Sequence, residues 1–351
     1  MELGIYHEFP MLPGRSQAEC FAAGFDIVDA AETYGLDVMW LAELHFDKPR
    51  AVLASPLVVG AAIAARTERI KIGTSVQVLP LANPLRIAEE AATVDQISKG
   101  RLIFGVGRSG VVKTYEALNI DYAESKEREI ECLAIIERAW QEERFSHTGR
   151  FYAFEDVTVV PQPVQRPTPE IRLAAVSPDT FTAAGEAGRG LFIAVRHEDA
   201  RMFKPQIDRF RQAWREAGHP GRGPVYLRCP GFVAATDAAA RAAYEPTLMQ
   251  HFQNQSHLLA DSARRQNTPP DHARWKTSQR LEEISFDETL RGSVLIGSPR
   301  TVIDKLQGLE RDIGLDGVQL DTNCAGLVDH AAEREAIRLL SQEVKAAFDG
   351  G

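Results

Sequence analysis

Residues 70–107 read IKIGTSVQVLPLANPLRIAEEAATVDQISKGRLIFGVG, and this stretch decides the fold. Two short apolar runs, 70–75 and 102–106, flank a segment, 85–97, in which apolar residues recur at helical spacing. A strand, a helix and a second strand in this order are typical of a parallel βαβ unit. The stretch therefore predicts an α/β fold built on a parallel sheet.

The same alternation extends through the rest of the chain. Apolar runs rich in branched side chains are separated by longer segments of helical period, such as 18–34 and 122–143. Counted from the N-terminus, the strand candidates are residues 3–7, 38–42, 70–75, 102–106, 171–175, 191–195, 225–234 and 317–320. Eight βα units predict a closed (β/α)8 barrel, the TIM barrel of the α/β class.

The length of the chain leaves room for insertions. The chain has 351 residues, whereas a barrel of this kind needs about 250. We expect one insertion at 149–169, where 151–154 and 157–160 have the pattern of a small hairpin, and another at 251–291, which is polar and has little periodicity. The second is interpreted as a mobile active-site lid, with a solvated loop as the alternative. Because no linker divides the chain, residues 1–351 are predicted to form a single domain.

Composition excludes several classes of protein. With 40 basic and 49 acidic residues the net charge is -9, without long runs of like charge, so no nucleic acid is expected as a partner. The longest uncharged stretches, 51–65 and 72–85, are too short to span a bilayer and contain prolines, so no membrane segment is expected. The N-terminus has no secretory pattern, which predicts a cytoplasmic protein. Four scattered cysteines and nine histidines form no metal-binding motif, so no metal is expected.

The residues that follow the predicted strands are polar and chemically varied. The active site of a parallel barrel lies at the carboxyl ends of its strands, so these residues are expected to share one rim. They are His7-Glu8, Glu43-Leu44-His45-Phe46, Ser75-Val76-Gln77, Gly107-Arg108-Ser109-Gly110, Ser177-Pro178-Asp179-Thr180 and Arg196-His197. A rim with this mixture of side chains predicts a polar cofactor pocket.

The turn at 105–110, GVGRSG, has the GxGxxG spacing of a dinucleotide-binding loop. That interpretation is disfavoured because no helix opens directly after the turn and no ribose-binding acid follows a next strand, which also argues against a nicotinamide dehydrogenase. Instead, the glycines let backbone approach a flat ligand, and Arg108 offers a fork to a phosphate. A tight turn with a surface arginine is the alternative.

A second phosphate-binding element is expected where the predicted helix 179–185 begins. Ser177 and Thr180 place two hydroxyl groups at its N-terminus, where backbone N–H groups favour an anion. The alternative is that these two residues only cap the helix.

Residues 35–46, GLDVMWLAELHF, resemble the GFDxxWxxEHHF segment of the bacterial luciferase-like flavin monooxygenases. The resemblance continues in order through 73–80 (GTSVQVLP), Asn83-Pro84, 95–101 (DQISKGR) and the 105–110 turn, and returns at 296–299 (IGSP). It implies a barrel that binds reduced FMN supplied by a separate flavin reductase. It also implies that O2 forms a flavin hydroperoxide that oxidises a small organic substrate. A homodimer or a luciferase-like heterodimer is implied as well.

The resemblance also implies roles for individual residues. Arg108 is similar to the phosphate-binding arginine of the family, and Ser177 and Thr180 match its phosphate-binding serine and threonine. Ser75-Val76 falls where luciferase has a cis non-proline peptide beside the isoalloxazine. Gly107 and Gly110 belong to the turn expected to lie against the flavin.

The chain departs from luciferase at two positions. Leu44 stands where the luciferase catalytic subunit has the first of two consecutive histidines, so light emission is not expected. Gly107 replaces a reactive cysteine, which is expected to open space beside the flavin. The remaining catalytic candidates are His45, Glu43 and His7, which would orient the oxidant or move protons. Alternative roles are purely structural: Glu43 would hold His45 or a backbone amide, and His7 would be a satisfied histidine of the rim.

Two other functions remain open on the same fold. One is a deazaflavin-dependent oxidoreductase, which is distinguished from an FMN enzyme by the cofactor that the purified protein retains. The other is a non-catalytic flavin-binding partner subunit, which the missing histidine at position 44 supports. Oxygen consumption with reduced FMN and no second chain would separate the second alternative from a monooxygenase.

Overall fold

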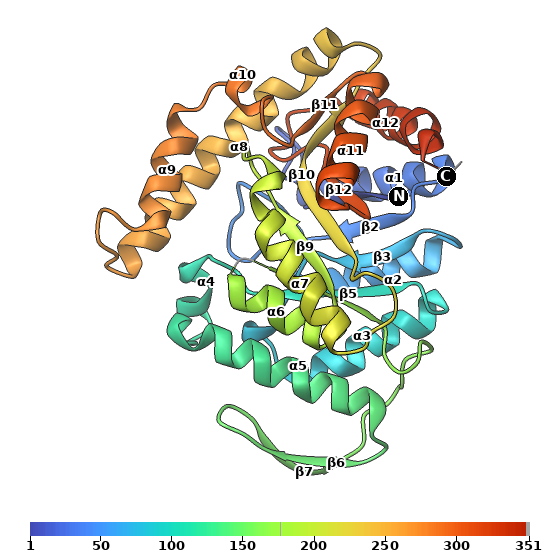
Figure 1. The fold of residues 1–351 in the computed structure, drawn as a ribbon, viewed down its shortest axis with the longest axis vertical. Coiled ribbons are helices and arrows are strands. Elements are labelled where there is room, and N and C mark those ends of the chain that lie inside the picture. Colours follow the sequence, from blue (N-terminus) through green and yellow to red (C-terminus); the bar gives the residue numbers. More distant parts are fainter. Residues whose placement is uncertain (176, 349–351) are drawn as a thin grey trace.

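The computed structural model describes residues 1–175 and 177–348, and its centre is a closed barrel of eight parallel strands (Figure 1). Going round the barrel, the strands are β1 (Glu2–His7), β2 (Val38–Leu41), β3 (Lys71–Thr74), β5 (Leu102–Gly107), β8 (Glu170–Ala174), β9 (Gly190–Ala194), β10 (Val225–Val233) and β12 (Gly317–Asp321). All eight predicted strands are therefore confirmed, and with them the TIM-barrel class.

The barrel closes because the first strand pairs with both the second and the last. In β1, Ile5 lies opposite Met39 of β2 on one side and Leu320 of β12 on the other. β10 pairs with β9 on one side and with β12 on the other, which completes the ring of strands. Two short strands were not expected: β4 (Gln77–Val78) pairs with β5, and β11 (Leu295–Gly297) pairs with the end of β10.

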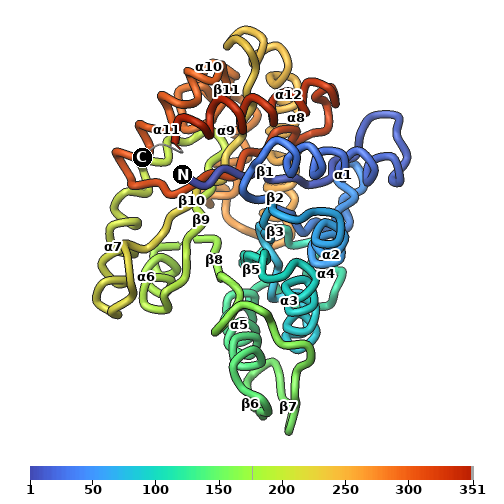
Figure 2. The backbone as a smooth tube through the Cα atoms, turned by 90° about the vertical axis from the view of Figure 1, so that its right-hand side faces the viewer, coloured from blue at the N-terminus to red at the C-terminus, as the bar shows by residue number. Residues whose placement is uncertain are grey.

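Helices cover the outside of the barrel, one after each strand (Figures 1 and 2). They are α1 (Gln17–Tyr34), α2 (Pro56–Arg66), α3 (Pro84–Ser98), α5 (Ser125–Gln141), α6 (Pro178–Glu186), α7 (Lys204–Glu216), α11 (Pro299–Ile313) and α12 (His330–Leu339), and α4 (Val112–Ala117) lies between β5 and α5. Several begin with a side-chain cap. Ser16 and Glu19 form a capping box at the start of α1, and Asn83 caps α3 ahead of Pro84. None of the helices in the described ranges is long and apolar enough to cross a membrane.

The end of the barrel opposite the cavity is filled by a buried arginine. Arg172 of β8 is 1% exposed, and its guanidinium lies 3.5 Å from the ring centre of Tyr226 and 5.1 Å from that of Trp40. Its Nη1 donates to Glu2 at 2.6 Å, and its Nε donates to Glu170 at 2.7 Å. The charge is therefore paired inside the barrel, and it ties β8 to the N-terminal strand.

The first insertion contains a hairpin, but not with the predicted strands. β6 (Phe145–Thr148) pairs antiparallel with β7 (Ala153–Val157), and the hairpin extends away from the barrel (Figure 2). The sequence-based assignment placed the turn too late, because Phe145 is buried and begins a strand whose other side chains are polar and more exposed. Only Phe145 of β6 and Phe154 and Val157 of β7 pack on the core, so the alternating pattern of the hairpin is weak.

The second insertion is helical, so its prediction as an aperiodic segment is wrong. Residues 251–291 contain the second half of α8 (Asp237–Arg265), followed by α9 (Ala273–Glu283) and α10 (Phe286–Thr289). α8 and α9 pack side by side, and a separate apolar cluster around Tyr244, Phe252 and Leu281 holds them against β10 and β11. The helical period is weak in the sequence because the contact between the two helices also buries hydroxyl groups. The Ser256 and Ser278 hydroxyls lie 2.9 Å apart and are both buried.

Candidate active site

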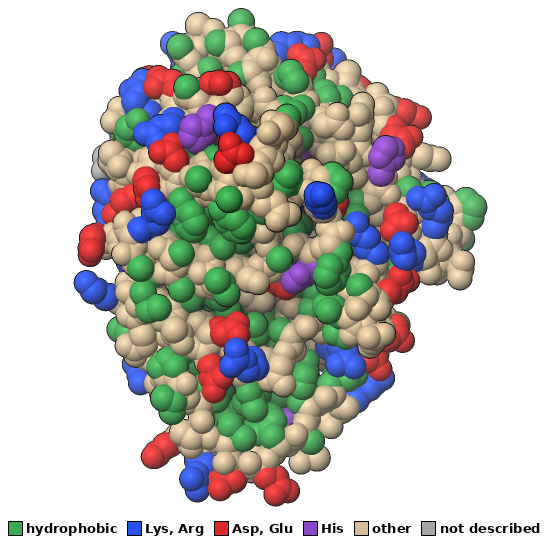
Figure 3. All heavy atoms as spheres, turned by 180° about the vertical axis from the view of Figure 1, so that it is seen from behind, with side chains coloured by type: hydrophobic (Ala, Val, Ile, Leu, Met, Phe, Trp, Pro, Cys, Tyr) green, Lys and Arg blue, Asp and Glu red, His purple; other side chains and the backbone are tan. Residues whose placement is uncertain are grey.

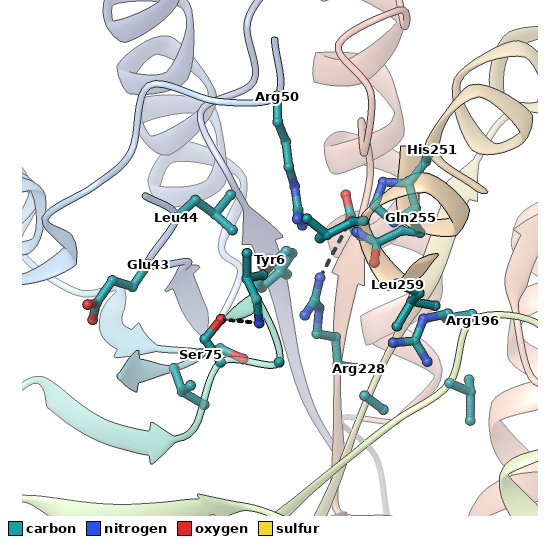
Figure 4. Close-up of a pocket in the computed structure, with 18 of the residues that line it drawn as sticks. Tyr6, Glu43, Leu44, Arg50, Ser75, Arg196, Arg228, His251, Gln255 and Leu259 are labelled. Atoms are coloured by element: carbon teal, nitrogen blue, oxygen red, sulfur yellow. Dashed lines mark hydrogen bonds and ion pairs between the residues drawn. The ribbon is translucent and has the colours of Figure 1, made fainter. Parts of the chain in front are cut away.

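A cavity of about 280 Å³ lies at the carboxyl ends of the barrel strands, the end where TIM-barrel active sites are built (Figure 4). Its floor and walls come from strand ends and the loops after them. One side is covered by α8, together with Arg274 of α9. The residues that line it include Tyr6, Glu43, Leu44, Arg50, Ser75, Val76, Arg108, Gly110, Arg196, Arg228, Cys229, His251, Phe252, Gln255, Leu258, Leu259, Arg274 and Asp321.

Arg108 lines this cavity directly after β5. Its Nε lies 3.4 Å from Glu129 of α5, and its Nη1 donates to the Ser125 hydroxyl at 3.3 Å. About a third of the side chain is exposed. Burial raises the pKa of Glu129 to about 7, although the charge of Arg108 opposes the shift. Arg108 therefore has one acidic partner, and near neutral pH that partner is only partly ionised.

Ser177 and Thr180 lie at the start of α6, outside the residues that line the cavity. Their hydroxyls lie 2.9 Å apart, and Ser177 makes no side-chain cap to the helix, so the interpretation of the pair as N-caps is not supported. The ion pair between Lys126 and Asp179, at 3.5 Å, shows that α5 and α6 begin beside each other. The Ser177 hydroxyl thus accepts no hydrogen bond from the first-turn N–H groups of α6. These N–H groups lie on the same side of the barrel as Arg108.

The backbone next to the cavity has the features that the resemblance implies. The Ser75–Val76 peptide bond is cis, and both residues line the cavity. Gly110 also lines it, and a Cβ atom built there would meet nothing within 4 Å. Gly107 differs from expectation: a Cβ would lie 3.0 Å from Ala174 and 3.1 Å from Val76. The exchange of cysteine for glycine therefore opens no space, because Val76 and Ala174 already fill it.

Glu43 and His45 form a pair behind the cavity wall. His45 Nε2 lies 2.8 Å from Glu43 Oε1, and the other Glu43 oxygen accepts from Gln77 Nε2 at 2.5 Å and from the Val78 N–H at 2.7 Å. Burial raises the pKa of Glu43. Glu43 reaches the main cavity, where Leu44 also lies, whereas His45 lines a small adjoining hollow of about 20 Å³. The carboxylate is thus fully engaged and can orient the imidazole of His45.

His7 lies apart from this group. Its Nδ1 accepts from the Phe9 N–H at 3.1 Å, and its Nε2 lies 3.8 Å from Glu333. It is buried and does not line the main cavity. The Phe9 N–H holds the ring through Nδ1, whereas Nε2 faces Glu333 from beyond hydrogen-bond distance, so His7 is placed by structural contacts away from the cavity.

The histidine that does line the cavity is His251 of α8, which sequence reasoning missed because 251–291 is predicted as an aperiodic lid in which no single side chain is placed. Its Nδ1 lies 3.0 Å from the Cys324 carbonyl oxygen, so Nδ1 carries the proton and donates. Burial lowers the pKa of His251 to about 4. The ring is therefore neutral at pH 7, with Nε2 as an acceptor.

The floor of the cavity is a network of charged groups. Arg50 Nε donates to Glu8 at 2.7 Å, and the Tyr6 hydroxyl donates to the same carboxylate at 3.0 Å. Burial alone would raise the pKa of Glu8, but the charge and hydrogen bonds of Arg50 outweigh it and lower the pKa. Burial raises the pKa of Asp321, and the nearby Glu8 carboxylate raises it further. The Cys229 thiol also lines the cavity, and burial raises its pKa to about 12.

Two of the missed residues left a signal in the sequence. Arg228 interrupts the apolar run 225–234, and a charged residue inside a barrel strand needs a partner or a ligand. Asp321 directly follows the last predicted strand and so belongs to the rim. Arg50 left no such signal, because its loop position gives no direction for its side chain. Within the described residues, no group of three His, Cys, Asp or Glu side chains could hold a metal ion.

Comparisons with known proteins agree with this fold. The family model described as luciferase-like monooxygenase matches residues 1–317. The oxygenase component of the flavin-dependent trigonelline monooxygenase of Acinetobacter baylyi is 25% identical over 84% of this chain and 82% of its own length. The F420-dependent glucose-6-phosphate dehydrogenase of Kineococcus radiotolerans is 37% identical, over 52% of this chain and 56% of its own. Among solved structures, the oxygenating constituent of the Pseudomonas putida 3,6-diketocamphane monooxygenase, in complex with FMN, has a TM-score of 0.80 at 24% identity and covers 98% and 97% of the two chains.

The chain belongs to the luciferase-like monooxygenase family, because the family model matches most of its length. The family resemblance predicted from residues 35–46 and the later motifs is confirmed. At the level of the family, so is the prediction of a flavin-dependent monooxygenase, an oxidoreductase that incorporates oxygen.

Proposed function

We propose that this chain is the oxygenase component of a two-component system that uses reduced FMN and O2 to oxidise a small organic substrate. The observation that supports it most is the position of Arg108 at the rim of the cavity, with its guanidinium about a third exposed and paired with a partly ionised carboxyl group, that of Glu129. A phosphate would give Arg108 a stronger charge-assisted partner than Glu129 does.

The residues present fit a flavin mononucleotide. Arg108 would hold the phosphate from one side, and the Ser177 and Thr180 hydroxyls with the N-terminus of α6 would hold it from the other. The Ser75–Val76 backbone and Gly110 would lie against the ring system, where few side chains stand in the way. When bound, the reduced flavin supplies the electrons that activate O2.

The chain's own polar groups would then orient the substrate and move protons. Glu43 fixes the imidazole of His45 through Nε2, which leaves its Nδ1 as the nitrogen able to exchange a proton. His251 would accept a hydrogen bond at Nε2, because its Nδ1 is held by the Cys324 carbonyl. α8 and α9 would exclude water from the cavity.

The proposal includes partners. A separate flavin reductase would supply reduced FMN, in line with the printed description of the Acinetobacter baylyi relative as an oxygenase component. We also propose a dimer, as a homodimer or a luciferase-like heterodimer. Figure 3 shows apolar side chains spread over the middle and lower part of one face, with some acidic and basic side chains among them. Light scattering on the purified chain would test for a homodimer.

Oxygen uptake tests the proposed function directly. The purified chain would be mixed with chemically reduced FMN, without a reductase or a second chain, and O2 consumption would be followed together with FMN binding. We expect stoichiometric FMN binding and O2 uptake that exceeds the rate for free reduced FMN when substrate is present. Tight FMN binding with no effect on O2 chemistry for any substrate would instead indicate the non-catalytic subunit.

A deazaflavin-dependent oxidoreductase is the second candidate, and the similarity to the Kineococcus radiotolerans enzyme favours it. Both cofactors carry a tricyclic ring and a phosphate, so Arg108 and the cavity would serve either one. Titration of the chain with FMN and with F420 under the same conditions distinguishes them. Binding of F420 at least about tenfold tighter than FMN would replace the FMN assignment.

A further inference from the structure

Three arginines from separate parts of the chain converge on one side of the cavity. Arg50 comes from the loop after β2, Arg196 follows β9, and Arg228 lies within β10. Figure 4 shows the guanidinium ends of Arg50 and Arg228 pointing toward each other, with the guanidinium of Arg196 to one side, next to Leu259 of α8. None of the three has a part in the proposed binding of the cofactor phosphate, which is assigned to Arg108.

The carboxylates in this region do not neutralise the three positive charges. Arg50 is paired with Glu8 through two hydrogen-bonding nitrogens. Arg228 lies 3.7 Å from Glu8 and 3.7 Å from Asp321, beyond hydrogen-bond distance of both, and its guanidinium stacks on Tyr6 at 3.4 Å from the ring centre. Glu8 is therefore shared by two arginines, and the raised pKa of Asp321 reduces the second negative charge.

Arg196 adds a charge that forms no ion pair with a carboxylate among the described residues. In the described part of the chain its guanidinium has no ion pair within 4.0 Å and no hydrogen bond. Glu198 attracts it, but the Glu198 carboxylate accepts from the backbone N–H groups of Arg196 and His197 instead. Burial lowers the pKa of Arg196, and repulsion from Arg228 and Arg50 lowers it further. The neutral His251 does not change this balance.

An excess of positive charge inside a protein costs free energy unless a ligand offsets it. Planar guanidinium groups that point to one place match the two oxygens of a carboxylate. Leu44, Phe252, Leu258 and Leu259 line the same cavity, and Figure 4 shows Leu44 on the Arg50 side and Leu259 beside Arg196. The cavity thus offers cationic groups with apolar side chains next to them.

We propose that the substrate of this enzyme is an organic acid with an apolar body, whose carboxylate is bound by Arg50, Arg196 and Arg228. This inference rests on the proposed function, because it names the class of substrate that the same site would bind. Of the three arginines, Arg196 would be stabilised most by a bound carboxylate, because Arg50 and Arg228 already have partial partners within the protein.

Paired acid and amide probes test the inference without turnover. Benzoate and benzamide have nearly the same shape and differ in charge, and their affinities for the FMN-loaded protein can be measured by calorimetry. We expect benzoate to bind at least about tenfold more tightly than benzamide. Arg196→Gln should weaken benzoate binding by about tenfold to a hundredfold and leave benzamide unchanged. Arg196→Lys should have an intermediate effect, and Arg300→Gln, at a 92% exposed arginine, should have none.

Four outcomes would overturn the inference. Equal affinity for benzoate and benzamide, or no binding of benzoate and of longer aliphatic acids at millimolar concentration, excludes an anionic substrate site. Benzoate binding that is unaffected by Arg196→Gln, in a protein that circular dichroism shows to be folded, excludes the proposed arginine site. The fourth outcome is a cofactor role for these arginines. Riboflavin lacks the phosphate of FMN, so if Arg196→Gln reduces the preference for FMN over riboflavin, the group binds the cofactor instead.

The same measurements separate this inference from the proposed function. If FMN binds and O2 uptake occurs but no acid binds, the monooxygenase assignment stands and the substrate class is wrong. If benzoate binds in an Arg196-dependent way but FMN does not bind, the anion site stands and the FMN assignment is wrong.

Discussion

Arg108 is the residue on which cofactor binding is expected to depend most. Loss of a charge-assisted hydrogen bond costs about 1.5 to 3 kcal/mol, so Arg108→Ala should weaken FMN binding by about tenfold to a hundredfold. Riboflavin affinity should not change, because riboflavin has no phosphate. Fluorescence titration with both ligands measures the two effects, and unchanged FMN affinity would remove Arg108 from the site.

The ionisation of Glu129 should make the binding of the FMN phosphate by Arg108 depend on pH. Its carboxyl group, with a pKa of about 7, is mostly neutral at pH 6.5 and charged at pH 8.5. The charged form pairs with Arg108 and repels a phosphate, so FMN should bind about fivefold more weakly at pH 8.5, since like charges 4 Å apart repel by about 1 kcal/mol even in water. The phosphate itself is mostly ionised over this range. Glu129→Gln should remove the pH dependence, and its persistence in that variant would assign it to another group.

His45 is expected to affect turnover rather than cofactor binding. General acid or base assistance contributes about 10²- to 10⁴-fold, so His45→Ala should lower substrate oxidation by at least about tenfold and change FMN affinity by less than about threefold. The measurement is kcat with a fixed supply of reduced FMN. If the variant instead loses thermal stability and keeps its turnover per folded molecule, His45 only supports the strand end through Glu43.

At the scale of elements, the α8–α9 hairpin should be stably folded without a ligand. Its helices bury Phe252 and Leu281 and are joined by the short connection 266–272. Limited proteolysis with mass spectrometry should therefore cut in 266–272 and spare the helices, with and without FMN. Cuts spread through 251–291 in the absence of ligand, and suppressed by FMN, would restore the interpretation of a lid that orders on binding.

The sequence was sufficient for the strands but not for this hairpin. Most barrel strands are buried on both faces and so appear as largely apolar runs, with Arg172 and Arg228 as charged exceptions. The α8–α9 contact buries Ser256 and Ser278 beside apolar side chains, and a pattern of apolar residues alone does not reveal it. Part of the sequence that resembles the luciferase-like family has a structural role. In the 95–101 motif, Asp95 accepts three hydrogen bonds from Val164 and Gln165.

At the scale of the molecule, Arg172 links the fifth barrel strand to the first and should matter for the stability of the whole barrel. Arg172→Ala would leave Glu2 without its partner and a cavity beside Trp40, at a cost of about 3 to 5 kcal/mol in unfolding free energy. Arg300→Ala is the exposed control and should change stability by less than about 0.5 kcal/mol. Urea denaturation measures both. A single transition would also support the prediction of one domain.

The site could be predicted only where its residues follow a strand. Arg108, Glu43 and Ser75 come from such positions, and the structure brings all three to the cavity. Arg50 and His251 come from a loop and from the long helix α8, so their approach depends on tertiary packing that no local pattern encodes. The balance of charge around Arg196 likewise exists only in the folded chain.

The buried thiol of Cys229 bears on how long such an enzyme survives its own chemistry. Sulfur reacts with peroxides as the thiolate, and a cysteine beside an oxygen-activating centre is exposed to that risk at every cycle. Because burial raises the pKa of Cys229 to about 12, the sulfur remains protonated at physiological pH and is a poor target. The burial that raises the pKa of Cys229 thus also protects its thiol from oxidation. Oxidation of this cysteine then need not limit how many turnovers each enzyme molecule completes.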